Sequence, residues 1–174
     1  MRYVFKLVRD RTGPVKLLSY VLVALSRLNG LTDRILVRPG HAPPVRATRE
    51  FVVARLAADR EFLFDSGAAL SAIYAARQSE EPTIEFRFRV TIKYYYRTDR
   101  GRIVTLRYDR YDLTVRTVED GVLLELSMLG GLSRTDPASL VDMIVEEARS
   151  ASGSAVPINV SVVPPGGTLG GSAR

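Results

Sequence analysis

The chain has 174 residues, 46% hydrophobic and 25% charged, and its 25 Lys and Arg against 19 Asp and Glu give a net charge of +6. These values are typical of one globular domain and exclude a chain that is mostly disordered. There is no cysteine, which excludes disulfides, thiolate nucleophiles and sulfur-ligated metals and favours a reducing, cytoplasmic location.

The positive charge is nearly all arginine and lies mainly in the first third of the chain. Residues 1–60 hold 12 Lys and Arg against 4 Asp and Glu, residues 61–120 hold 10 against 10, and residues 121–174 hold 3 against 5. Arginine enrichment is typical of GC-rich genomes and thermophiles as well as of phosphate binding. We therefore expect an anion-binding surface, with these candidate residues: Arg2, Arg34, Arg38, Arg46, Arg49 and Arg55.

The first elements follow from hydrophobic periodicity. Residues 2–9 alternate between two faces and predict a half-buried strand, and residues 15–28, apolar nearly all round, predict a buried helix. The apolar run at 17–25 is too short to span a bilayer and lacks the layout of a signal peptide. A short strand is expected at 34–38.

The middle of the chain alternates between loops and ambiguous elements. Residues 39–44, Pro-Gly-His-Ala-Pro-Pro, predict a loop. Residues 49–56 fit either a strand or a helical turn, and we interpret them as a strand. Asp59 is placed to cap a helix over 60–77, which Ser66-Gly67 can break into two.

Residues 84–97, IEFRFRVTIKYYYR, give the clearest strand pattern. Apolar and aromatic side chains occupy the even positions. Basic and other polar side chains share the odd positions with Tyr95, which predicts a half-buried strand rather than an aromatic platform for nucleic acid. A tight turn leads into a strand at 102–117, whose apolar phase changes near Asp109-Arg110 and predicts a bulge. A further strand at 122–128 completes a three-stranded antiparallel meander.

The C-terminal part predicts a helix and a tail. A helix is expected from Pro137 to about Ser150. The fold class is α+β, with an antiparallel sheet packed on one face by helices in a single domain over residues 1–151. Residues 152–174 form a tail rich in Gly, Pro and Ser, with a short strand at 158–163 and a mobile segment from Pro164.

Two known architectures resemble this order of elements. Residues 2–38, in which Asp10-Arg11-Thr12-Gly13-Pro14 joins a strand to an apolar helix, resemble the opening of ACT domains, which bind small ligands, often amino acids. That resemblance implies a ferredoxin-like βαββαβ order, followed by a β-hairpin and the last helix. From Arg49 onward, the elements instead resemble the helix-grip fold of START-like and plant-allergen-like proteins, which enclose hydrophobic ligands.

The residue types argue against catalysis. His41 is the single histidine and lies in the Pro-Gly loop, so we predict no catalytic residue, metal site or cofactor. The carboxylates alternate with arginines or follow helical spacing, as surface ion pairs do. We expect a non-catalytic protein that binds nucleic acid or another anionic partner. The alternatives are a module that holds a hydrophobic small molecule under a curved sheet and a homo-oligomeric interaction subunit, such as a homodimer.

Overall fold

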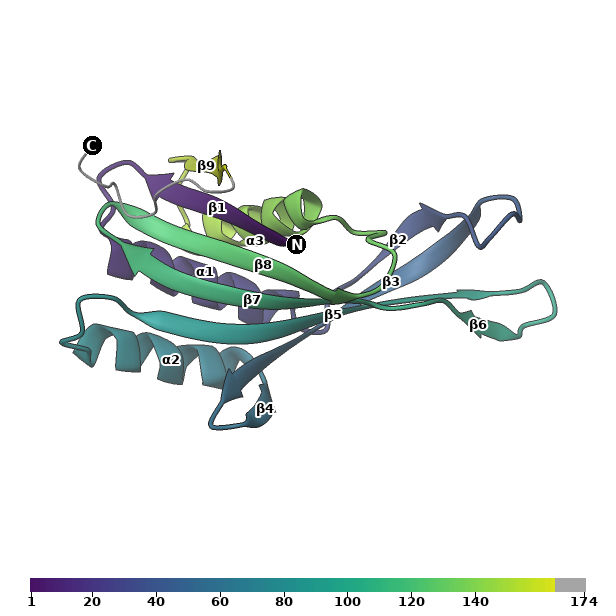
Figure 1. Ribbon diagram of the computed structural model, residues 1–174, viewed down its shortest axis with the longest axis horizontal. Helices are drawn as coiled ribbons and strands as arrows, with labels where there is room; N and C mark the ends of the chain where they lie inside the picture. The colour runs from purple at the N-terminus through teal and green to yellow at the C-terminus, as the bar shows by residue number, and fades with distance from the viewer. Residues whose placement is uncertain (165–174) are drawn as a thin grey trace.

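The computed structural model describes residues 1–164, which form a curled antiparallel sheet and three helices (Figure 1). The helices are α1 (Pro14–Leu28), α2 (Ser66–Gln78) and α3 (Pro137–Ser152). The strands are β1 (Arg2–Arg9), β2 (Thr32–Val37), β3 (Val45–Ala57), β4 (Arg60–Leu63), β5 (Glu85–Arg97), β6 (Ile103–Thr105), β7 (Asp109–Val118), β8 (Gly121–Gly130) and β9 (Ile158–Val163). The fold is therefore α+β, and the sheet is shaped as a half-barrel.

The sheet has the strand order β2-β3-β5-β7-β8-β1-β9, with β4 paired to β3 and β6 paired to β5. Its inner face shares one apolar core with the helices, and α1 contacts β3, β7 and β8 directly. Several side chains of α1 are completely buried in that core, namely Leu17, Leu18, Val21, Leu22 and Leu25. Burial of this helix in the shared core contributes to the hydrophobic stabilisation of the fold.

The alternating pattern of β5 is confirmed. Phe88, Val90, Ile92 and Tyr94 are completely buried on the inner face, whereas the odd positions are partly or fully exposed. Tyr95 lies on the outer face with the charged side chains, because neighbouring residues of a strand point to opposite sides of the sheet. Five further strand or helix predictions are also confirmed, for residues 2–9, 15–28, 49–56, 137–150 and 158–163.

The ferredoxin-like order expected from the opening residues is not present. β1 pairs with β8 and β9, and the meander β5-β7-β8 lies between β3 and β1. The physical reason is that β1 finds its hydrogen-bond partners in strands more than 100 residues further along the chain, at 121–130 and 158–163. Local periodicity does not report such long-range pairing.

Two boundaries also differ from expectation. Residues 60–63 form β4 rather than the first turn of a helix, because Ala58 and Asp59 adopt positive φ angles of 50° and 61° and turn the chain back onto β3. The cap of α2 is Asp65, whose Oδ1 accepts a hydrogen bond from Ala68 N at 2.8 Å. Asp59 is therefore a turn residue and not a helix cap.

The strand expected at 102–117 is divided into β6 and β7. The register of β7 with β8 shifts between Arg110 and Tyr111, which confirms the predicted irregularity in the strand. β9 extends the sheet beyond β1. The mobile segment expected from Pro164 lies outside the described residues, apart from Pro164 itself.

Candidate nucleic-acid interface

Two hairpins project beyond the helices at one end of the molecule (Figure 1). β3 and β5 are paired as far as Thr48 and Tyr95, after which β3 continues with β2 alone and β5 continues with β6 alone. The two hairpins therefore diverge from a common base. We call residues 32–48 and 93–108 together the fork.

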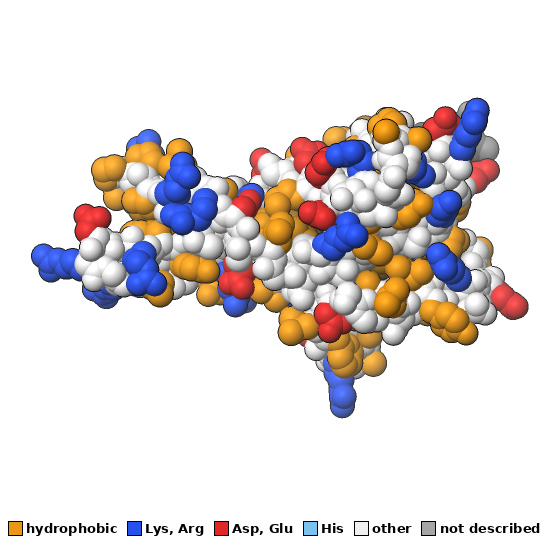
Figure 2. Space-filling model, turned by 180° about the vertical axis from the view of Figure 1, so that it is seen from behind, with side chains coloured by type: hydrophobic (Ala, Val, Ile, Leu, Met, Phe, Trp, Pro, Cys, Tyr) orange, Lys and Arg blue, Asp and Glu red, His pale blue; other side chains and the backbone are white. Residues whose placement is uncertain are grey.

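The fork carries the entire net charge of the chain. Residues 32–48 contain three Lys and Arg and one acidic residue, and residues 93–108 contain five and one, so eight positive charges face two negative ones. The rest of the chain keeps 17 of the 25 Lys and Arg and 17 of the 19 Asp and Glu, and is neutral. Seen from behind, the projecting end displays several Lys and Arg side chains and few acidic ones (Figure 2).

The basic residues of the fork are also unneutralised. Ion pairs within residues 1–164 engage basic side chains of the body, including Arg2 with Glu125 and Lys6 with Asp120, and none of the eight basic residues of the fork. One of the two acidic residues of the fork, Asp33, is bound by Arg49 at 2.8 Å and 2.5 Å. An anion approaching the fork thus meets basic groups that have no competing carboxylate of residues 1–164 within ion-pair distance.

The structure brings together half of the arginines proposed from the sequence. Arg34, Arg38 and Arg46 lie exposed on the β2–β3 hairpin of the fork. Arg49 lies at the base of the fork, with its guanidinium bound to Asp33. The other two are elsewhere: Arg2 is on β1, 3.5 Å from Glu125, and Arg55 covers the ring of Phe86 at 4.8 Å on the inner face.

Sequence reasoning missed the larger share of the basic fork. Five basic residues come from the second hairpin and its connection to β7: Lys93, Arg97, Arg100, Arg102 and Arg107. Counting over 60-residue windows hid them, because residues 61–120 are neutral as a whole. The local signal was the basic run from 97 to 107, which contains a single acidic residue, Asp99.

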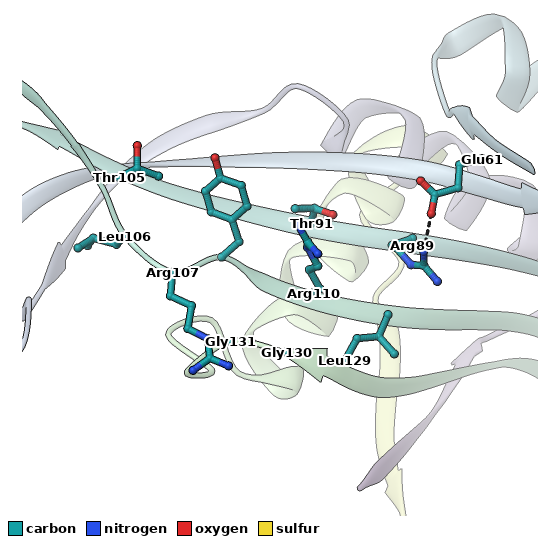
Figure 3. A pocket seen from close by; sticks show the side chains of 11 residues that line it. Glu61, Arg89, Thr91, Thr105, Leu106, Arg107, Arg110, Leu129, Gly130 and Gly131 are labelled. Atoms are coloured by element: carbon teal, nitrogen blue, oxygen red, sulfur yellow. Dashed lines mark hydrogen bonds and ion pairs between the residues drawn. The ribbon is translucent and has the colours of Figure 1, made fainter.

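A hollow of about 750 Å3 lies on the outer face of the sheet beside the base of the fork (Figure 3). We call it the basin; its lining is Glu61, Arg89, Thr91, Thr105, Leu106, Arg107, Tyr108, Arg110, Leu129, Gly130 and Gly131. Arg89 is bound by Glu61 and by Asp112, whereas Arg107 and Arg110 form no ion pair within the described chain. The ring of Tyr108 lies 5.9 Å from the ammonium of Lys93. The basin thus combines two free guanidinium groups with an aromatic ring.

A buried carboxylate fixes the wall of the basin. Asp109 is completely buried, and its Oδ1 accepts hydrogen bonds from the backbone N–H groups of Leu132 and Ser133, both at 2.9 Å. Gly131 has a φ of 109°, and a Cβ there would lie 2.3 Å from Asp109 Oδ1, so only glycine fits this close approach. The loop between β8 and α3 is therefore held against the start of β7.

A chain of hydrogen bonds continues from Asp109 to the base of the fork. The hydroxyl of Tyr94 donates to Asp109 Oδ2 at 2.6 Å and lies 2.8 Å from Thr135 Oγ1, which accepts from Arg49 at 3.0 Å. Burial, together with the bond to the Asp109 carboxylate, raises the pKa of Tyr94 far above its ordinary value near 10. These contacts orient the fork relative to the helices, so the network has a structural role.

The described residues hold no cluster of three or more His, Asp or Glu side chains that could bind a metal ion. His41 is exposed in the turn between β2 and β3, within the fork. No helix within residues 1–164 has both the length and the apolar character needed to cross a membrane. Comparisons of the chain with protein-family models, with curated proteins and with solved structures find no significant match.

Proposed function

We propose that this protein binds nucleic acid through the phosphate backbone, using the fork and the adjoining basin. The observation that carries the proposal is the charge of the fork. Its eight basic residues form no ion pair within residues 1–164 and, against its two acidic residues, account for the whole net charge of +6. Phosphate contacts by Lys and Arg release counterions and supply most of the sequence-independent affinity for nucleic acid. A neutral body behind a basic fork would direct a polyanion to that one end.

A cavity for a hydrophobic ligand, the alternative from the helix-grip resemblance, is less favoured. Such a ligand would occupy the space under the curved sheet, where α1 places completely buried leucines. The basin lies on the opposite, outer face and is lined largely by polar and charged side chains. Its character suits an anionic ligand better than an apolar one.

Salt-dependent binding tests the proposal directly. A labelled RNA or DNA oligonucleotide of about 20 nucleotides is titrated with the protein by fluorescence anisotropy between about 50 and 200 mM salt. The triple variant Arg34→Gln, Arg46→Gln, Arg100→Gln removes three positive charges from the fork. We expect its affinity at low salt to fall at least about tenfold, and the slope of log K against log salt to become shallower by about 2.

A matched variant separates the effect of the charge on the fork from the effect of the net charge of the whole protein. Lys16, Arg27 and Arg77 are exposed on the helices of the body, and replacing all three by Gln lowers the net charge by the same amount. We expect this variant to bind nearly as well as the wild type. Absence of binding at low salt, or an equal loss in both triple variants, would overturn the proposal.

A homodimer is the second candidate, because one observation favours protein contact. β4 and α2 expose four large apolar side chains, Phe62, Leu63, Leu70 and Tyr74, with exposed fractions of 48%, 64%, 68% and 68%. Apolar surface of this kind is often covered by another chain. Sedimentation equilibrium should then give a mass that rises with protein concentration for the wild type and remains that of the monomer for Leu70→Glu. A wild-type mass equal to that of the monomer at every concentration would exclude a homodimer.

A further inference from the structure

The outer face of the sheet at the base of the fork carries two tyrosines among its basic groups. Tyr95 is directed to this face because its neighbour Tyr94 is completely buried on the inner one. Tyr108 comes from the connection between β6 and β7 and lines the basin. Both side chains are partly exposed.

The strand register places Tyr95 and Tyr108 close to each other on the outer face of the sheet. Tyr95 is paired with Thr105 of β6, and Thr105 lines the basin together with Tyr108. Lys93, two residues before Tyr95, lies about 7 Å from it along the strand on the same face. The ammonium of Lys93 in turn lies 5.9 Å from the ring of Tyr108. One lysine therefore adjoins both aromatic rings.

Three guanidinium groups without an ion pair in residues 1–164 flank this pair of rings. Arg97 follows Tyr95 by two residues on the same face of β5, where its guanidinium donates to the carbonyl of Gly101 at 3.1 Å. Arg107 and Arg110 reach into the basin from either side of Tyr108 in the sequence, and in Figure 3 Arg110 extends toward Thr91 on β5. The surface thus alternates aromatic rings with positive charge along β5 and the basin.

This combination distinguishes single strands from duplexes. Proteins that bind single-stranded nucleic acid pair a basic groove with aromatic side chains on which unpaired bases stack. The bases of a duplex already stack on one another, so a duplex can use the arginines but not the rings. The basin volume of about 750 Å3 falls within the range of pockets that hold small organic ligands, and so suits a single nucleotide.

We propose that the outer face at the base of the fork is a binding platform for single-stranded nucleic acid. Unpaired bases stack on Tyr95 and Tyr108, and Arg97, Arg107 and Arg110 hold the flanking phosphates. This inference rests on the proposed function and specifies its ligand class. Glu50, opposite Lys93 in the register of β3 and β5, is the nearest opposing carboxylate on β3 and favours close contact by bases rather than phosphates at that position.

The test compares the affinities for a single strand and for a duplex of the same length, measured at the same salt concentration. We expect the wild type to bind the single strand more tightly. Tyr108→Ala should weaken single-strand binding by about 5- to 100-fold, as expected for the loss of one stacked base, and leave duplex binding and the salt slope unchanged. Tyr108→Phe keeps the ring and should bind like the wild type. Tyr95→Ala repeats the test at the second ring. Tyr3→Ala, at an exposed tyrosine of β1 outside the fork and the basin, is the control.

The outcomes separate this inference from the proposed function. If duplex and single strand bind equally and neither Tyr95→Ala nor Tyr108→Ala changes single-strand affinity, the proposal of a single-strand platform is wrong. The proposal of salt-dependent binding by the fork is then unaffected. If no nucleic acid binds at low salt, both proposals fall. Circular dichroism of each variant shows that a lost affinity reflects the ring and not unfolding, and the two alanine variants give independent readings.

Discussion

Asp109 shows how a single residue can organise the region beside the basin. Its carboxylate accepts hydrogen bonds from four donors, the backbone N–H groups of Leu132, Ser133 and Thr135 and the hydroxyl of Tyr94. Burial of a carboxylate is tolerated only with such compensation. In the sequence, this aspartate looked like one more surface carboxylate between arginines. Nothing in the local pattern indicated that the loop before α3 would cover it.

The Asp109 network should contribute strongly to stability. Asp109→Asn replaces one acceptor oxygen by an amide group facing N–H donors, and we expect it to lower the free energy of unfolding by about 3 kcal/mol. Asp112→Asn is the matched control, because Asp112 is a partly exposed carboxylate that pairs with Arg89 at 3.2 Å on the outer face. It should cost less than about 1 kcal/mol. Urea unfolding measures both, and equal losses would contradict a special role for Asp109.

The buried tyrosines predict a loss of stability in alkali. Burial raises the pKa of Tyr94 and of Tyr111, so both stay protonated in the folded protein above pH 10 while the unfolded chain ionises. Their contribution is complete below the ordinary tyrosine pKa near 10 and is lost as the pH rises above it. The limiting slope is about 1.4 kcal/mol per pH unit for Tyr94, and Tyr111 adds to the fall. Urea unfolding between about pH 9 and 11 measures this slope.

Tyrosine-to-phenylalanine variants show which tyrosine causes the fall of the unfolding free energy in alkali. Tyr94→Phe removes one of the two ionising groups and should make the fall of unfolding free energy with pH shallower. Tyr111→Phe removes the other group and should also make the fall shallower. A wild-type slope in Tyr94→Phe would mean that Tyr94 ionises equally in both states.

At the scale of elements, periodicity gave reliable information where one face of an element is buried. β5 alternates as predicted because its inner face belongs to the apolar core that the sheet shares with the helices. α1 is buried nearly all round because it contacts both the sheet and the other helices. Prediction was wrong for residues 60–63, where two positive φ angles at non-glycine residues make a hairpin that residue preferences disfavour. Tertiary pairing with β3 outweighs that local cost.

At the scale of the whole molecule, folding redistributes the charge. Residues 1–60 carry a balance of +8 in the sequence, but Arg2 and Arg55 lie away from Arg34, Arg38 and Arg46 in space. Strand pairing then places residues 93–108 beside residues 32–48, although about 60 residues separate them along the chain. The result is a fork with a balance of +6 on a neutral body. A basic surface of this kind exists only in the folded chain.

The sequence alone determined the α+β class, most strands and helices, and the two faces of β5, because each depends on how a local segment divides between core and water. It also excluded cysteine chemistry by composition. Strand order, the fork, the basin and the Asp109 network were decided by the tertiary structure. Each requires contacts between distant segments, and the energy of those contacts depends on which surfaces meet, not on the pattern within either segment.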